Sequence, residues 1–267
     1  MSAGILDVAQ DAARAGGEVL ERYWRSLPGG AIEEKKKNDF VTRADKESEE
    51  VVVATIRERF PEDGFLGEEG GQRGSGGEAR TWLIDPLDGT SNFIAGFPFW
   101  CVSVAAREKR EIVAGVVWDP LRGEMYAAEK GGGAFRNGER ISVSPHRGLD
   151  GAFLATGFPF RHKERVDLYL SLFRQLFFQA RAIRRAGSAA LDLANVAAGV
   201  FDGFFEFRLS AWDIAAGAIL VEEAGGRMSD FDGRDRFWER GNVVAGNPGV
   251  ADEILRVASG LFSDEEI

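Results

Sequence analysis

Residues 82–93 read Trp-Leu-Ile-Asp-Pro-Leu-Asp-Gly-Thr-Ser-Asn-Phe, an apolar run that ends in two acids, a glycine and two hydroxyl residues. A strand here would deliver Asp85 at its end. Pro86 fixes one backbone dihedral, so the chain can turn and bring Asp88 back beside Asp85. Two carboxylates in one small volume repel each other, and a divalent cation between them removes that penalty. The stretch therefore predicts a metal site at the end of a strand.

The same stretch also offers groups for an anion. The Leu87 carbonyl lies inside the turn and is a candidate third oxygen ligand. Gly89, Thr90 and Ser91 can open a short helix whose free amides point at a phosphate. The alternative is that both acids are ordinary turn formers, since Asp-Pro and Asp-Gly pairs are common in loops. A haloacid dehalogenase loop does not fit, because two residues separate the acids where that loop has one.

Composition limits the metal to one that oxygen atoms bind. The 267 residues include one cysteine, Cys101, and two histidines, His146 and His162. This excludes a disulfide framework and a zinc site with several His and Cys ligands. Magnesium and other hard cations prefer carboxylate oxygens. Lys and Arg number 33 against 43 Asp and Glu, a formal net charge of −10, so charge-driven nucleic-acid binding is not expected.

Nothing in the sequence suggests a membrane. The first residues carry no basic leader, and no apolar run approaches the roughly 20 residues that span a bilayer. A single cysteine also fits a reducing compartment. We therefore expect a cytoplasmic protein with no membrane partner.

The first half of the chain has the pattern of an α+β unit. Apolar spacing predicts helices over 3–25 and 46–60, and period-two runs between 81 and 144 predict an antiparallel sheet. The last of these runs is Arg-Ile-Ser-Val-Ser at 140–144. Asn137-Gly138 predicts a hairpin turn. Six glycines within 67–77 predict a mobile surface loop.

The second half alternates strands and helices, which predicts a sheet with helices packed on it. We expect a layered α/β molecule of two domains, with residues 1–147 carrying most metal ligands and residues 148–267 carrying the substrate side. The site would lie at their junction. The predicted elements are strands at 152–156, 181–184, 201–206, near 227–231 and near 242–246, and helices at 165–180, 188–199, 211–224 and 249–260.

Further acids stand at the ends of predicted elements. Glu68 and Glu69 follow a short apolar segment, although such a pair alone is usually a solvated face. Asp213 follows Ser210 at the start of a helix as in a capping box, and Asp45 can cap the helix after it. Capping and catalysis are compatible roles.

Four motifs occur in one order, namely Asp-Phe-Val-Thr-x-x-Asp at 39–45, Gly-Glu-Glu at 67–69, Asp-Pro-Leu-Asp-Gly-Thr-Ser-Asn-Phe at 85–93 and Trp-Asp-Ile-Ala-Ala-Gly at 212–217. Through them the sequence resembles the inositol monophosphatase family of magnesium-dependent, lithium-sensitive phosphatases, from the first helix to about residue 260. The resemblance implies a layered αβαβα fold, two or three magnesium ions at the domain junction, and a homodimer.

The resemblance also implies a role for each motif residue. Glu68, Thr90 and Asp45 would be catalytic, with Thr90 and Glu68 orienting a water that magnesium makes more acidic. The metal ligands would be Glu68, Asp85, the Leu87 carbonyl, Asp88 and Asp213. The substrate would meet Leu87, Asp88, Gly89, Thr90, Arg184, Gly187, Ser188, Ala189, Glu206 and Asp213. Within this set, the amides of Gly89 and Thr90 would hold the phosphate and Glu206 the hydroxyls of a sugar or inositol.

Several alternatives stay open at this point. Arg185 competes with Arg184, and the family's metal-side lysine matches Lys35, Lys36 or Lys37. The expected substrate is inositol 1-phosphate or a similar polyol phosphate, while relatives on the same scaffold act on fructose 1,6-bisphosphate, 3′-phosphoadenosine 5′-phosphate or histidinol phosphate. A protein-binding role independent of catalysis is a second reading. A calcium module is a third, although EF-hand spacing is absent.

Overall fold

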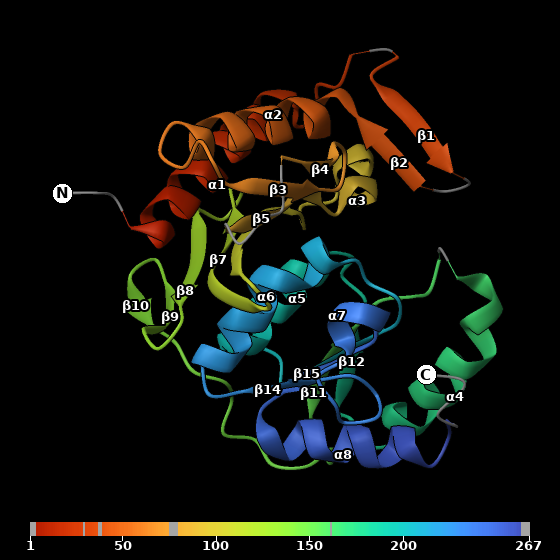
Figure 1. The fold of residues 1–267 in the computed structure, drawn as a ribbon. Helices are drawn as coiled ribbons and strands as arrows, with labels where there is room; N and C mark the ends of the chain where they lie inside the picture. Colours follow the sequence, from red (N-terminus) through yellow and green to blue (C-terminus); the bar gives the residue numbers. More distant parts are fainter. Residues whose placement is uncertain (1–3, 29, 37–38, 75–79, 161, 263–267) are drawn as a thin grey trace.

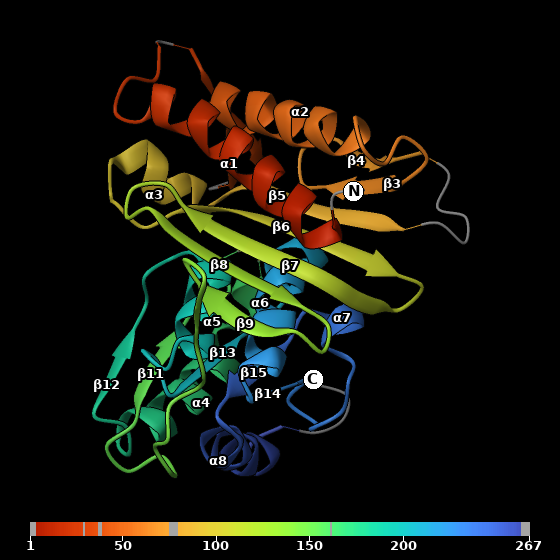
Figure 2. The same ribbon diagram turned by 90° about the vertical axis from the view of Figure 1, so that its left-hand side faces the viewer.

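The structure is a computed structural model that describes residues 4–28, 30–36, 39–74, 80–160 and 162–262. Helices and sheets alternate in five layers, from α1 and α2 at one side to α4 and α8 at the other (Figures 1 and 2). The predicted αβαβα fold is therefore confirmed. No helix in the described part of the chain is long and apolar enough to cross a membrane.

The larger sheet has eight strands and carries the first helices on its outer face. Its strands are β3 (Gly64–Gly67), β4 (Gly71–Arg73), β5 (Thr81–Asp88), β6 (Cys101–Glu108), β7 (Glu111–Asp119), β8 (Glu124–Glu129), β9 (Gly133–Arg136) and β10 (Glu139–Arg140). Their order is β10-β9-β8-β7-β6-β5-β3-β4, and β3 and β5 are its parallel pair. The covering helices are α1 (Ile5–Tyr23) and α2 (Arg43–Arg57), and a hairpin of β1 (Ile32–Lys36) and β2 (Asp39–Thr42) leads from one to the other.

The smaller sheet has five strands in the order β12-β11-β13-β15-β14. They are β11 (Phe153–Thr156), β12 (Ala182–Arg184), β13 (Gly203–Glu206), β14 (Arg227–Ser229) and β15 (Val243–Gly246). Strand β11 runs parallel to both of its neighbours, and the other pairs are antiparallel. The remaining helices are α3 (Thr90–Ala95), α4 (Val166–Phe177), α5 (Ala189–Ala197), α6 (Ala211–Glu223), α7 (Phe237–Arg240), α8 (Pro248–Ser259) and the 3-10 turn η1 (Lys163–Arg165).

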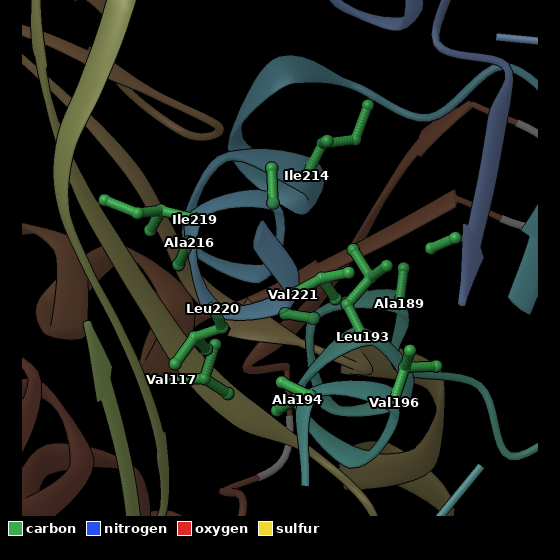
Figure 3. Packing of buried hydrophobic residues seen from close by; sticks show 14 of the residues in the cluster. Val117, Ala189, Leu193, Ala194, Val196, Ile214, Ala216, Ile219, Leu220 and Val221 are labelled. Atoms are coloured by element: carbon green, nitrogen blue, oxygen red, sulfur yellow. The ribbon is translucent and has the colours of Figure 1, made fainter. Parts of the chain in front are cut away.

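Strand alternation in β5 separates two cores. Trp82 and Ile84 pack toward α1 and α2, whereas Leu83 packs toward α5 and α6, because successive side chains of a strand face opposite sides. Helix α6 is buried over nearly its whole length, from Asp213 to Val221, as expected of a helix between two sheets. Figure 3 shows the apolar side chains of α5 and α6 packed against each other and against Val117 of the larger sheet.

Three predicted segments differ from the structure. The segment 141–144 is not a strand, because the amides of Ile141 and Val143 bond to Ala134 and Ala224 as the chain leaves the sheet. The charged residues 33–36, for which the sequence pattern predicts no strand, belong to β1 of the β1–β2 hairpin. Residues 71–73 form β4 against β3, so the mobile-loop prediction is wrong there; residues 75–79 lie outside the described part.

The predicted domain boundary at 147 falls between the last strand of the larger sheet and the first strand of the smaller one. The central apolar cluster takes side chains from both sides of that boundary, including Leu83 and Ala194. The two halves therefore share one core, and a site at their junction is held from both directions.

Gly115 of β7 is required by the close approach of α6. A Cβ there would lie 2.5 Å from Cγ2 of Ile219 and 2.9 Å from Cα of Ala216. We expect Gly115→Ala to lower the free energy of unfolding by about 1–3 kcal/mol, as overpacked cores do. Gly64→Ala in β3 is the matched control, since its Cβ would meet no atom nearer than 3.7 Å. Urea denaturation checks this, and equal losses in the two variants would contradict it.

Candidate active site

A bulge in β5 places two acids on one face of the larger sheet. Asp85 pairs with Ser103 and Asp88 pairs with Cys101, so three steps along β5 match two steps along β6. In a regular strand, residues three apart face opposite sides; the extra residue restores a common side. Asp85 is buried, and its Oδ1 accepts a hydrogen bond from the Leu87 amide at 3.0 Å. The predicted turn between the two acids is thus a strand bulge.

The parallel pairing of β3 with β5 brings Glu68 to the same level. Gly67 pairs with Ile84, and the amide of Glu68 donates to the Ile84 carbonyl at 3.2 Å. Buried Glu49 of α2 holds this corner, because its carboxylate accepts from the Glu69 amide at 2.9 Å and from Arg73 at 3.0 Å. Its charge is thereby partnered, and the loop after β3 is fixed in place.

Asp213 reaches the site from the other half of the molecule. It lies in the first turn of α6, and its Oδ2 accepts from the amide of Ser210 at 2.7 Å. Ser103 Oγ of β6 donates to the Trp212 carbonyl at 3.3 Å, which ties the start of the helix to the sheet beside the two acids of β5. The capping role predicted for Asp213 is confirmed, and the same turn directs the residue to the cavity.

Asp45 and Thr90 form a second hydrogen-bonded unit. Thr90 Oγ1 lies 3.0 Å from Asp45 Oδ1 and 3.0 Å from the Leu87 carbonyl oxygen. A hydroxyl has one proton, so donation to Asp45 leaves the carbonyl free to meet another partner. Thr42 donates its amide and its hydroxyl to Asp45 Oδ2. Burial raises the pKa of Asp45 to about 6, while the bonds from Thr42 and Thr90 lower it.

The electrostatics of the site fit a hard cation. Burial, and then the charges of Glu68, Asp88 and Asp213, raise the pKa of Asp85 well above its ordinary value. All four groups offer only oxygen, and a bound cation would remove their mutual repulsion. As the side chains stand, however, no three His, Cys, Asp or Glu groups among the described residues lie close enough to share one ion.

The hydrogen bonds of Asp88 explain part of the separation between these acids. Its Oδ2 accepts from Ser188 Oγ and from the Ala190 amide, both at 2.7 Å. Asn92 adds a second bridge, since its Nδ2 donates to the carbonyls of Phe99 at 2.7 Å and Ala186 at 2.9 Å. The loop before α5 is therefore bonded to the strand end that carries the acids.

These groups border one cavity of about 390 Å³ between the two halves. Of the predicted site residues, those that line it are Glu68, Asp85, Leu87, Asp88, Gly89, Thr90, Gly187, Ser188, Ala189, Glu206 and Asp213. Asp45 stands behind the wall and contacts the cavity through Thr90. Lys37 lies outside the described residues, as do the side chains of Lys35 and Lys36.

Arg184 is not a residue of this cavity, which corrects the sequence-based choice. Its guanidinium lies 4.8 Å from the ring of Phe153 and borders a separate pocket with Arg122. Arg185 lines the main cavity instead, with its guanidinium 5.5 and 5.1 Å from the rings of Phe158 and Phe160. Neighbouring residues at the end of β12 face opposite sides, so only one of the two arginines can reach the cavity.

The sequence analysis missed several polar residues of the cavity wall, among them Asp192 and His162. Asp192 lies four residues after Ser188 on α5, a helical spacing that puts both on one face; this spacing could have identified it. His162 lies in a loop where no periodic pattern applies. Cys101 is buried with its Sγ 3.5 Å from Ser188 Oγ, and burial raises the pKa of its thiol.

Comparisons with known proteins show what the chain is similar to. The family model described as the inositol monophosphatase family matches residues 2–260. The chain is 49% identical over 247 residues to "Nus factor SuhB" of Pseudomonas aeruginosa, covering 91% of each chain.

Two solved structures have a similar fold. The extragenic suppressor protein suhB of Bartonella henselae has a TM-score of 0.92 at 37% identity, with 96% of this chain and 98% of that chain covered. An inositol monophosphatase of Anabaena (Nostoc) sp. has a TM-score of 0.87 at 37% identity, with 98% of each chain covered.

The two glycines that flank α3 give a matched test of the site backbone. Both have positive φ, +101° at Gly89 and +72° at Gly96. A Cβ on Gly89 would lie 2.9 Å from the Phe99 carbonyl oxygen, whereas one on Gly96 would lie 3.8 Å from its nearest neighbour. We expect Gly96→Ala to cost about 1–2 kcal/mol from backbone conformation alone. Gly89→Ala should cost about 1–3 kcal/mol more, measured by urea unfolding; indistinguishable costs would refute the close contact.

Proposed function

The chain belongs to the inositol monophosphatase family, and on that premise we propose that it is a magnesium-dependent phosphomonoesterase acting on inositol 1-phosphate or a similar polyol or sugar phosphate. The observation that carries the proposal is the buried Asp85, whose pKa is raised by three further acids that line the same cavity. A cluster of this kind is stable near neutral pH when a cation compensates it. The Thr90–Asp45 pair beside it supplies a group for orienting a nucleophile.

Magnesium is assigned to the acidic end of the cavity. Glu68, Asp85, the Leu87 carbonyl, Asp88 and Asp213 would hold two or three ions. When bound, magnesium supplies Lewis-acid stabilisation of the phosphate and the leaving oxygen, and it makes a water more acidic. Because Asp88 and Asp213 now accept hydrogen bonds from Ser188, Ala190 and Ser210, their carboxylates would have to share their oxygens or turn to take up the ion.

The protein's own groups orient the reactants. Asp45 accepts a hydrogen bond from the Thr90 hydroxyl. The lone pairs of the Thr90 oxygen would then hold a water together with Glu68. The amides of Gly89 and Thr90 would bind the phosphate, with Gly187, Ser188 and Ala189 forming the facing wall. Glu206, at the end of β13, would accept hydrogen bonds from substrate hydroxyls. The reaction would then be direct attack of water on phosphorus, in line with the ester oxygen.

A protein-binding role is a second candidate, and it is compatible with catalysis. The observation that favours it is the name "Nus factor SuhB" carried by relatives that are 40–49% identical to this chain.

Lithium sensitivity, a homodimer and a cytoplasmic location are part of the primary proposal through the family resemblance.

The carboxylates of the acidic end can be tested with isosteric amides. We expect Asp88→Asn and Asp213→Asn to fold normally and to lose about 100-fold or more of magnesium-dependent turnover. Each variant lacks a carboxylate that would hold magnesium beside the reacting phosphate, so the electrostatic stabilisation of the transition state is lost. Asp252→Asn on α8, where Asp252 pairs with Arg227 far from the cavity, is the control and should retain activity. Steady-state phosphate release measures all three, and full activity of either site variant would overturn the assignment.

The same variants separate catalysis from protein binding. If hydrolysis is the function, Asp88→Asn should fail to restore growth in a strain that lacks the gene, while Asp252→Asn should restore it. Restoration by a variant without turnover would show that the required function is the protein-binding one.

The leaving alcohol can be identified with a panel of esters. We expect inositol 1-phosphate to have the highest kcat/KM among inositol 1-phosphate, fructose 1,6-bisphosphate, 3′-phosphoadenosine 5′-phosphate and histidinol phosphate. The reason is that the motif at 88–93 followed by Gly-Phe-Pro-Phe at 96–99 resembles the inositol-specific members. Initial rates at matched concentrations measure the order, and a preference for any of the other three would replace the proposed substrate.

A further inference from the structure

Asp192 is a buried acid at the cavity wall, and one of its carboxyl oxygens has no hydrogen-bond partner among the described residues. The residue is 1% exposed, and the oxygen in question is Oδ1. Burial and the charges of Glu206 and Asp88 all raise its pKa, and the charge of Arg185 lowers it. A buried carboxyl oxygen left unpaired costs stability, so its retention at the cavity wall calls for a group that reaches it from the cavity.

Arg185 is the basic counterpart on the same wall. Its guanidinium rests against the rings of Phe158 and Phe160, both of which are substantially exposed. Gly187 gives it room, because a Cβ on that residue would lie 2.4 Å from Arg185 Nη1. Stacking on two rings holds the planar group while leaving its N–H edge for hydrogen bonds.

The chemistry of the ligand follows from this pairing. Asp192 and Glu206 are hydrogen-bond acceptors when ionised, and Arg185 is only a donor. An anionic group at this end of the cavity would meet two carboxylates, and a cationic group would meet the guanidinium. A hydroxyl donates and accepts at once, so neighbouring hydroxyls of an uncharged polyol satisfy all three side chains.

We propose that Asp192 and Arg185 form a hydroxyl-recognition subsite that selects phosphate esters of polyols over esters of simple alcohols. The inference rests on the proposed phosphatase function, which it deepens by assigning specificity to Asp192, a residue outside the family motifs, acting with the arginine that faces the cavity. Asp192 would accept from one hydroxyl and Arg185 would donate to its neighbour, beside Glu206. The first turn of α5 connects this subsite to the acidic end of the cavity. Ser188 precedes the helix and donates a hydrogen bond to Asp88, and Asp192 lies four residues later, in the first turn.

The test compares two esters that differ in hydroxyl content. For each variant, kcat/KM is measured with inositol 1-phosphate and with ethyl phosphate, and their ratio is compared with that of the unmodified protein. Asp192→Leu should lower the ratio at least about tenfold, the effect of losing a hydrogen bond to a charged group. Asp192→Asn, which keeps a hydrogen-bonding group, should lower it less. Arg185→Gln should also lower the ratio, whereas Arg184→Gln, on the other side of the strand end, should leave it within about twofold.

Thermal unfolding distinguishes recognition from a structural role. Because Oδ1 of Asp192 has no hydrogen-bond partner among the described residues, and because burial opposes its charge, Asp192→Leu should retain or raise the melting temperature. A lower melting temperature with an unchanged ratio would overturn the proposal. So would equal ratios in the Arg184→Gln and Arg185→Gln variants, and these two exposed positions remain informative even if Asp192→Leu fails to fold.

A binding measurement separates failure of this inference from failure of the phosphatase proposal. Saturation-transfer NMR with free myo-inositol should give a signal for the unmodified protein and for Arg184→Gln, and a reduced signal for Asp192→Leu and Arg185→Gln. If no ester is hydrolysed but this pattern is found, the phosphatase proposal falls and the subsite stands. If esters are hydrolysed and neither the ratio nor the signal changes, the subsite falls alone.

Discussion

The repulsion among buried acids at the end of β5 is the constraint on which the rest of the molecule depends. Asp85 is buried beside Asp88, with Glu68 and Asp213 close enough to raise its pKa. Such an arrangement opposes folding, so the surrounding structure must impose it. The β5 bulge, the parallel β3 strand and the first turn of α6 each contribute one or two of these acids, and hydrogen bonds from Glu68 to β5 and from Ser103 of β6 to Trp212 connect these elements.

The same constraint explains why the site lies where the two halves meet. The buried α5 and α6 share one apolar core with the larger sheet, and Ser188, Ala190 and Asn92 bond the loop before α5 to the strand end. Apolar burial supplies most of the folding free energy, and the polar bridges set the register between the halves. Stability is thus supplied by the core, while the unfavourable charge is confined to its edge.

Hydrophobic periodicity predicted most helices and strands of this fold. It failed where the strand pattern is weak or where a side chain's direction depends on contacts between distant parts of the chain. The β1–β2 hairpin was missed because β1 is mostly charged and neither strand alternates. The choice between Arg184 and Arg185 depends on which face of β12 meets the cavity, a fact that spacing in one sequence does not contain. Asp192 was within reach of the helical spacing from Ser188, whereas the bulge that aligns Asp85 with Asp88 needs the register of β6.

The acids proposed to hold magnesium and the side chains proposed to recognise hydroxyls lie at different places along one wall of the cavity. Its acidic end collects carboxylates that a cation would neutralise, so the net charge of −10 does not oppose a phosphate there. Its other end places Arg185 beside Asp192 and Glu206, so that one hydrogen-bond donor group and two acceptor groups lie together and neighbouring hydroxyls can bond to all three. Because α5 connects the two ends rigidly, a substrate held by its hydroxyls would have its phosphate positioned at a fixed distance from the acids, which is how binding energy is converted into orientation.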